Sequence, residues 1–183
     1  MKSVKSAKSV KSAIVVLGLV VSGFVAGGTA IVSTTVAFAA TAKSCVASQI
    51  KVTHGPSDGT AGTIYFPIVF TNTGAACTLF GVPAIQPVTG TTHKKVGPIA
   101  RNESMGEMPA IHSLSEGQSV SGAFGVVETG NFTPSTCVVR KASGVLVTLG
   151  SFVPSTYVGL AITVCTKRAS TTTRLIVAGV TGN

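Results

Sequence analysis

The three histidines of the chain, His54, His93 and His112, are the side chains that could most directly bind a metal ion. Neutral imidazole is a common metal ligand, but none of these residues lies within ligand spacing of another. A three-histidine site would require the fold to gather them, and isolated histidines at the surface or at strand ends are the simpler interpretation. We therefore predict no metal site and no cofactor.

Glu103 and Glu107 are a second candidate for chemistry, because paired carboxylates catalyse glycoside hydrolysis. Such a pair must flank a cleft whose environment separates the two pKa values. Both residues instead fall in one segment that contains glycine and methionine, as expected for solvated acids of a loop. The chain also lacks a G-x-S-x-G nucleophile elbow and the glycine patterns of dinucleotide and phosphate-binding loops. We therefore predict no catalytic residue and expect that the protein is not an enzyme.

The four cysteines, Cys45, Cys77, Cys137 and Cys165, predict two disulfides in an oxidising compartment. Four cysteines allow three pairings. We favour Cys45–Cys77 and Cys137–Cys165, because each pair lies near the outer ends of two successive strand patterns and a hairpin-like return would bring it together. Each bridge would close a loop of about 30 residues and contribute about 3–4 kcal/mol by the chain-entropy model.

Residues 1–42 have the organisation of a secretory signal peptide. An uncharged, largely apolar stretch, 12–42, follows a lysine-rich start and contains the small-residue steps Ala37-Phe38-Ala39 and Ala40-Thr41-Ala42. The lysines of the start are Lys2, Lys5, Lys8 and Lys11. The alternative is an uncleaved anchor, since the apolar run approaches the roughly 20 residues that span a bilayer. Either case predicts export, with residues 43–183 forming one domain outside the cytoplasm.

The net charge of +9 overstates the basic character of that domain, because four of the 14 Lys and Arg residues lie in the leader and none of the five acids does. The remaining basic residues are scattered, with pairs only at Lys94-Lys95, Arg140-Lys141 and Lys167-Arg168. Nucleic-acid binding proteins concentrate positive charge and often interleave it with aromatic residues. We therefore expect no nucleic-acid partner, and a membrane contact only through residues 1–42 if these are retained.

Period-two alternation indicates strands throughout the exported part. It is clearest over Val46–Thr53 and Ile64–Thr71, and Pro67 in the second run predicts an edge strand or a bulge, because proline donates no hydrogen bond. The further predicted strands are Cys77–Phe80, Ala84–Val88, Ile111–Leu114, Val120–Val127, Val145–Leu149, Tyr157–Cys165 and Arg174–Val180. Many short strands separated by turn residues predict an antiparallel β-sandwich.

Turn residues and aromatic residues complete this prediction. We expect turns at Gly55–Gly59, with Asp58 as a turn former, and at Asn72-Thr73-Gly74, where Asn and Gly tolerate positive φ. Gly81-Val82-Pro83 is expected to redirect the chain. The chain has no Trp, so the predicted core uses Phe66, Phe70, Phe80 and Phe124 with branched aliphatic residues. The least strand-like stretch, Pro98–Pro109, is expected to be an exposed loop at one end of the sandwich.

The order of these motifs resembles the secreted actinobacterial family catalogued as domain of unknown function 4232. The resemblance runs from Cys45 to about Val180 and is carried by segments that include Gly62–Asn72, Cys77–Pro83 and Val96–Arg101. Leu149-Gly150-Ser151 and Ser115 depart from the family at turns, where relatives tend to carry proline. The resemblance implies an export signal and an immunoglobulin-like sandwich with two bridges. It implies no activity.

These observations favour a non-catalytic binding or interaction module at or outside the cell envelope. The candidate contact surface is the loop from Arg101 to Pro109, with Arg101, Glu103, Met105, Glu107 and Met108 as its candidate residues. Its partner would be an envelope polymer or a secreted protein. One alternative is a structural envelope component held by charge on anionic polymers. The other is a secreted hydrolase or a proteinase inhibitor, although no cysteine braces the chain beside Met105 or Met108.

Overall fold

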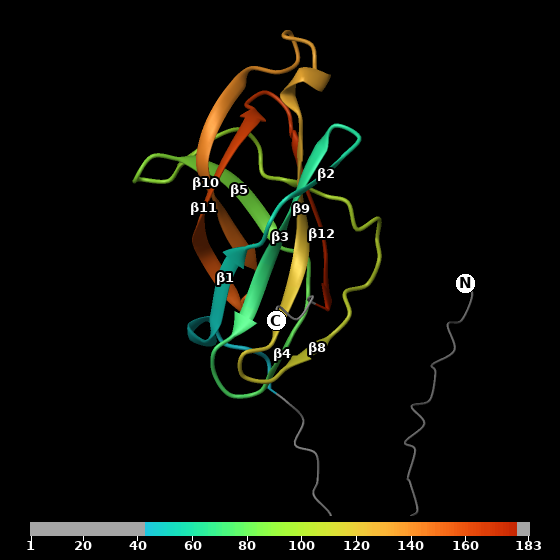
Figure 1. Cartoon of the computed structure of the whole chain (residues 1–183). Coiled ribbons are helices and arrows are strands. Elements are labelled where there is room, and N and C mark those ends of the chain that lie inside the picture. The colour runs from blue at the N-terminus through green and yellow to red at the C-terminus, as the bar shows by residue number, and fades with distance from the viewer. Residues whose placement is uncertain (1–42, 179–183) are drawn as a thin grey trace, which may run out of the picture. The chain divides into compact units, whose positions relative to one another are not determined.

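Two β-sheets pack around one apolar core in the computed structural model, which describes residues 43–178 (Figure 1). The strands are β1 (Ile50–His54), β2 (Asp58–Thr60), β3 (Thr63–Asn72), β4 (Cys77–Leu79), β5 (Ala84–Thr89), β6 (Lys94–Lys95), β7 (Arg101–Asn102), β8 (His112–Leu114), β9 (Ser119–Val127), β10 (Val139–Leu149), β11 (Val153–Cys165) and β12 (Thr171–Ala178). One sheet has the order β1-β3-β9-β12-β7 with β2 also paired to β3, and the other has the order β11-β10-β5-β6. The strands β4 and β8 form a separate pair.

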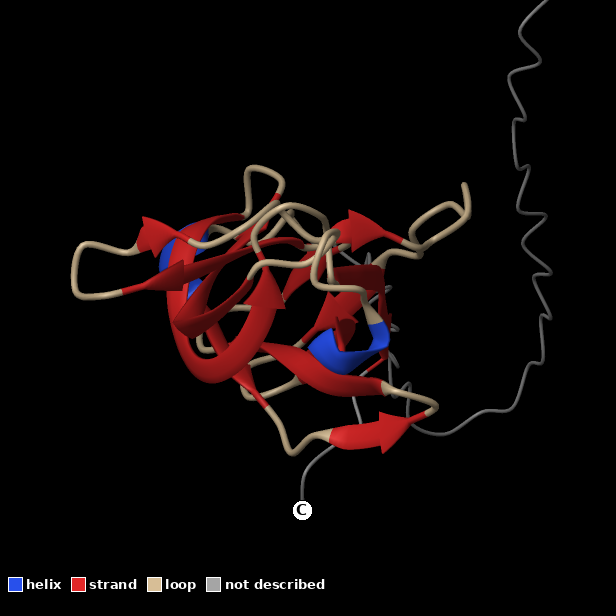
Figure 2. Ribbon diagram, turned by 90° about the horizontal axis from the view of Figure 1, so that it is seen from above, coloured by secondary structure: helices blue, strands red, loops and turns tan. Residues whose placement is uncertain are grey.

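This arrangement confirms the expected all-β fold. Two short 3-10 turns, η1 (Ala47–Gln49) and η2 (Thr129–Asn131), are the only helical segments among the described residues and are blue in Figure 2. The strand pairs are antiparallel except β7 with β12, which is parallel. The predicted signal peptide, residues 1–42, lies outside the described residues, as do the last two positions of the predicted strand Arg174–Val180.

The core of the first sheet follows the alternation of β3 and β9. Ile68, Phe70 and Phe124 are completely buried, and in the register of the two strands Phe70 lies opposite Val120. Phe66 lies opposite Phe124 and packs against the core while remaining partly exposed. Phe66, Phe70 and Phe124 therefore take their predicted places.

Phe80 does not belong to this core. Its side chain is 40% exposed, and its ring meets Phe152 edge-on with the centroids 5.3 Å apart. Leu79 holds the buried position instead and is fully covered. The prediction for Phe80 was wrong because β4 ends one residue before it.

The second sheet is dominated by a long hairpin between β10 and β11. Val145 and Val147 of β10 are buried, and β11 alternates buried and exposed residues over most of its length. Both strands begin earlier than predicted, at Val139 and Val153. The charged pair Arg140-Lys141 and the proline at position 154 hid these starts, although all three are tolerated at exposed positions of the hairpin.

The first predicted strand begins too early in the sequence-based assignment. Residues 47–49 form η1, and β1 starts only at Ile50. The side chain of Gln49 explains the difference, because its Oε1 accepts a hydrogen bond from the backbone N–H of Val46 at 3.2 Å. This contact closes a turn where the alternation predicts extended chain.

Pro67 lies in an interior strand, so the predicted edge position was wrong. β3 pairs with β9 on one side, while β1 and then β2 occupy its other side. The proline stands at the break between these two partners, where its carbonyl accepts a hydrogen bond from Gly55 N–H at 2.9 Å. The missing N–H of the proline therefore falls where the ladder is already interrupted.

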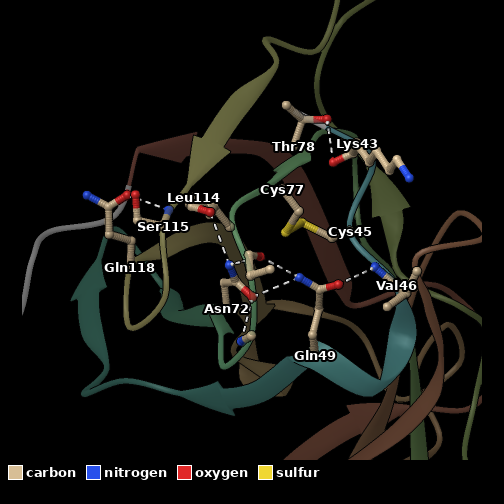
Figure 3. The surroundings of a disulfide bond; sticks show 12 residues. Lys43, Cys45, Val46, Gln49, Asn72, Cys77, Thr78, Leu114, Ser115 and Gln118 are labelled. Carbon is tan, nitrogen blue, oxygen red and sulfur yellow. Dashed lines mark hydrogen bonds between the residues drawn. A yellow bond between two sulfur atoms is a disulfide. The ribbon is translucent and has the colours of Figure 1, made fainter. Parts of the chain in front are cut away.

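Both predicted disulfides are confirmed. Cys45–Cys77 joins the segment before β1 to β4, and Cys137–Cys165 joins the segment before β10 to the end of β11. Figure 3 shows the first bridge. At the same place Cys45 N–H donates to Thr78 C=O at 3.0 Å.

Two of the predicted turns are built differently from the expectation. Neither Asn72 nor Gly74 adopts a positive φ; instead the Asn72 side chain accepts the Gly74 N–H at 3.0 Å. Asp58 begins β2 rather than forming a turn, and the hairpin reverses at Ala61 and Gly62, with φ of 46° and 76°. Gly81, with φ of 129°, does redirect the chain as expected.

Candidate functional site

The segment from Ile99 to Ile111, which we call the methionine loop, is fixed at both ends. Before it, Ala100 N–H donates to Ile85 C=O at 2.9 Å, and β7 pairs with β12 through the register Thr172↔Arg101. After it, β8 pairs with β4 beside the first disulfide. The loop begins in the short edge strand β7 and runs beside β12 rather than at an end of the sandwich, which corrects the prediction (Figure 1).

Local hydrogen bonds shape the tip of the loop. Asn102 Oδ1 accepts the Ser104 N–H at 2.8 Å, and Ser104 C=O accepts the Glu107 N–H at 2.8 Å. Between them, Met105 and Gly106 both have positive φ, 51° and 82°. Two successive left-handed residues produce a tight reversal that directs the methionine side chain outward.

The loop carries an unusual amount of exposed apolar surface. Met105 is 93% exposed, Met108 86%, Ile111 69% and Ile99 52%. Four of the eight large hydrophobic side chains that are exposed in the described chain thus fall in these 13 residues. Clustered exposed apolar side chains mark interaction sites more often than single ones do.

The predicted residues of this loop have different environments. Arg101 is exposed and belongs to β7, while Glu107 is exposed beyond the tip. Glu103 is partly buried and has interaction partners. Ser104 is only 5% exposed, and its Oγ has no hydrogen-bond partner in the described part of the chain. Neither glutamate lines any of the three hollows described below.

A cationic hollow of about 490 Å³ lies beside the base of the loop. Its wall contains three basic side chains, two hydroxyl groups and one alanine, which are Arg101, Lys167, Arg168, Ser135, Thr136 and Ala169. Sequence reasoning noted the Lys167-Arg168 pair but treated it as scattered charge. The predicted Cys137–Cys165 bridge was the signal that could have placed this pair beside Ser135 and Thr136.

A second hollow, of about 340 Å³, opens between β3, β9, η2 and β11. Its apolar wall includes Ile64, Phe66, Val126 and Ile162, and Glu128 lies at its polar side. A third hollow, of about 490 Å³, lies beside His93, whose ring stacks on Tyr157 with the centroids 4.2 Å apart. None of the candidate residues of the methionine loop lines either hollow.

The histidines are distributed over β1, the β5–β6 turn and β8. Over residues 43–178, no group of three or more His, Cys, Asp or Glu side chains is placed to hold a metal ion. The same residues contain no helix long and apolar enough to cross a bilayer.

The fold and these surfaces define a small β-sandwich domain with two disulfides, an exposed apolar loop and a cationic hollow. The family model described as Domain of unknown function (DUF4232) matches residues 45–180, and the chain belongs to this family. No curated protein and no solved structure matches the chain.

Proposed function

We propose that the protein is an exported, non-catalytic binding domain that engages another protein through the methionine loop. The observation that carries the proposal is the exposure of Met105, Met108 and Ile111 on a segment whose two ends are fixed by strand pairing. A loop anchored in this way presents apolar side chains at a low cost in conformational entropy on binding. Methionine adapts its shape to a partner surface, because its side chain is unbranched and polarizable.

The charge of the loop defines the chemistry of the partner. Two of the five acids of the chain, Glu103 and Glu107, lie within the methionine loop. Glu107 is the exposed acid beside the methionines, whereas Arg101 lies at the base of the loop and Glu103 has partners within the chain. We infer an apolar groove with a basic residue at its rim that faces Glu107, since complementary charge gives orientation and a faster encounter. Export is supported by the two disulfides, which persist in oxidising compartments.

Photo-crosslinking provides a sharp test, because the chain contains only three methionines, Met1, Met105 and Met108. The full chain, expressed with photo-methionine in place of methionine, is mixed with envelope and medium proteins of the producing organism and irradiated. We expect a crosslinked protein whose attachment maps to position 105 or 108. Excess unlabelled wild type should abolish the crosslink.

Two unlabelled variants, added as competitors in place of the wild type, test whether the crosslink depends on the methionine loop. M105G/M108S should fail to compete, whereas V139S, which removes another exposed apolar side chain, should compete as well as the wild type. Equal competition by M105G/M108S would refute the role of the loop. Turnover of a protease or glycoside substrate that is lost in E103Q would refute the non-catalytic assignment.

A further inference from the structure

The cationic hollow gathers charge from segments that are distant in sequence. Arg101 comes from β7, and Lys167 and Arg168 from the connection between β11 and β12. The wall of the hollow contains no acidic side chain. A bound anion would therefore supply the negative charge that the wall itself does not provide.

The walls of the hollow are held by covalent and hydrogen-bonded links. The Cys137–Cys165 disulfide fixes the turn that carries Ser135 and Thr136 against the end of β11. Just after this bridge, Thr166 N–H donates to Val138 C=O at 2.9 Å. The basic pair follows directly, so its backbone has a defined position relative to the turn.

Contacts within the domain also restrict individual side chains around the hollow, which lowers the entropy that binding an anion would cost. The Arg168 guanidinium lies over the Phe132 ring, 4.8 Å from its centroid, and this cation–π contact restricts the arginine. Ser135 Oγ lies 3.0 Å from Thr133 Oγ1, and either hydroxyl can be the donor. Thr133 Oγ1 also lies 3.0 Å from Thr136 Oγ1, which donates to Thr133 C=O at 3.0 Å, so hydrogen bonds hold both hydroxyl groups of the wall in place.

We propose that this hollow binds phosphate groups. Three positive charges match the double charge and the several oxygens of a phosphate better than the single charge of a carboxylate. Arginine in particular forms bidentate hydrogen bonds with phosphate oxygens. The site goes beyond the proposed function, since it uses a different surface and a different ligand chemistry.

Calorimetric titration tests the site with three probes: inorganic tripolyphosphate, a glycerol phosphate polymer and polyglutamate of matched charge. The protein is the full chain, purified in the form that the expressing host yields. We expect both phosphate probes to bind more tightly than polyglutamate. A small-molecule site would bind tripolyphosphate and the polymer equally per phosphate, whereas a polymer site would prefer the glycerol phosphate chain. Failure of both phosphate probes to bind would overturn the proposal.

Two double variants separate a built site from diffuse charge. K167Q/R168Q and K94Q/K95Q remove the same net charge from exposed positions. We expect K167Q/R168Q to lose about tenfold or more in phosphate affinity, since a charge-assisted hydrogen bond contributes at least that much, and K94Q/K95Q less than about twofold. Equal losses in the two variants would overturn the proposal. M105G/M108S should retain phosphate binding, so failure of this site and failure of the proposed function are distinguishable.

Discussion

The side-chain amides of Gln49 and Asn72 are hydrogen-bonded at 3.1 Å, from Gln49 Nε2 to Asn72 Oδ1. Asn72 is completely buried, and both polar atoms of its side-chain amide are hydrogen-bonded. Its Nδ2 donates to the carbonyls of Ala75 and Leu114 at 2.9 and 3.0 Å, while its Oδ1 also accepts the Gly74 N–H. One side chain thus links the end of β3 to the chain before β1 and to β8 (Figure 3).

Replacing the buried amide of Asn72 should lower the stability of the fold. We expect N72A to lower the free energy of unfolding by about 2–4 kcal/mol, because it leaves buried backbone groups without partners. N72D keeps the shape of the side chain but loses the N–H groups that face Ala75 and Leu114 C=O, so it should also destabilise strongly. Urea unfolding followed by circular dichroism measures both effects.

Gln49 provides the control for this prediction. It is partly exposed, so water can replace the hydrogen bonds that its side chain makes. Q49A should therefore cost about 1 kcal/mol or less. If N72A unfolds at the same urea concentration as Q49A, the assignment of Asn72 as the central link is wrong.

The role of Asn72 illustrates what the sequence could and could not predict. The alternation of Ile68 and Phe70 predicts their burial directly, because a strand presents every second side chain to the same face. The same alternation places Asn72 toward the core, but no sequence pattern shows that Leu114 C=O and Gln49 lie there to satisfy it. The residue types at 72–74 predicted a turn with positive φ. The turn is instead closed by the Asn72 side chain, which accepts the Gly74 N–H.

For the candidate surfaces too, the sequence predicts local features but not the contacts between distant segments. The methionine loop could be found from its lack of alternation and its glycine and proline residues. The pairing of Arg101 with Thr172 could not be predicted from the sequence, because a two-residue parallel contact between distant segments leaves no periodic signal. The cationic hollow depends on this pairing and on the Cys137–Cys165 bridge together.

Substitutions of Gly55 and Pro67 should have non-additive effects on the free energy of unfolding. A Cβ atom at position 55 would lie 2.7 Å from Pro67 Cγ, so G55A must displace the proline ring or the chain around it. We expect G55A to destabilise the protein by about 1–3 kcal/mol, as overpacking does. P67A removes the obstructing ring, so the double variant should be less destabilised than the sum of the two single variants.

A double-mutant cycle from chemical denaturation measures this coupling. G59A serves as the control, because a Cβ atom there would meet no atom within 4 Å and position 59 has no positive φ. G59A should be additive with P67A. Additivity of G55A with P67A would contradict the close approach.

The two disulfides should stabilise the fold to a similar extent but differ in their effect on the cationic hollow. Their sequence separations of 32 and 28 residues predict that C45A/C77A and C137A/C165A each lose about 3–4 kcal/mol in the chain-entropy model. Only C137A/C165A frees the turn of Ser135 from the strand that precedes Lys167. It should weaken tripolyphosphate binding under conditions where both variants are folded, while C45A/C77A should not.

The tip of the methionine loop offers a test of backbone strain that is independent of any partner. Gly106 has a φ of 82°, and a Cβ atom there would meet nothing within 4 Å, so G106A should destabilise by about 1 kcal/mol through its backbone conformation alone. Met105 occupies the left-handed region with a side chain, and M105G should relieve that strain and leave stability unchanged or slightly raised. The midpoint temperature of thermal unfolding should therefore fall in G106A. In M105G it should stay the same or rise. Destabilisation by M105G of more than about 1 kcal/mol, which exceeds what glycine adds through the unfolded chain, would show that the exposed methionine packs within its own domain.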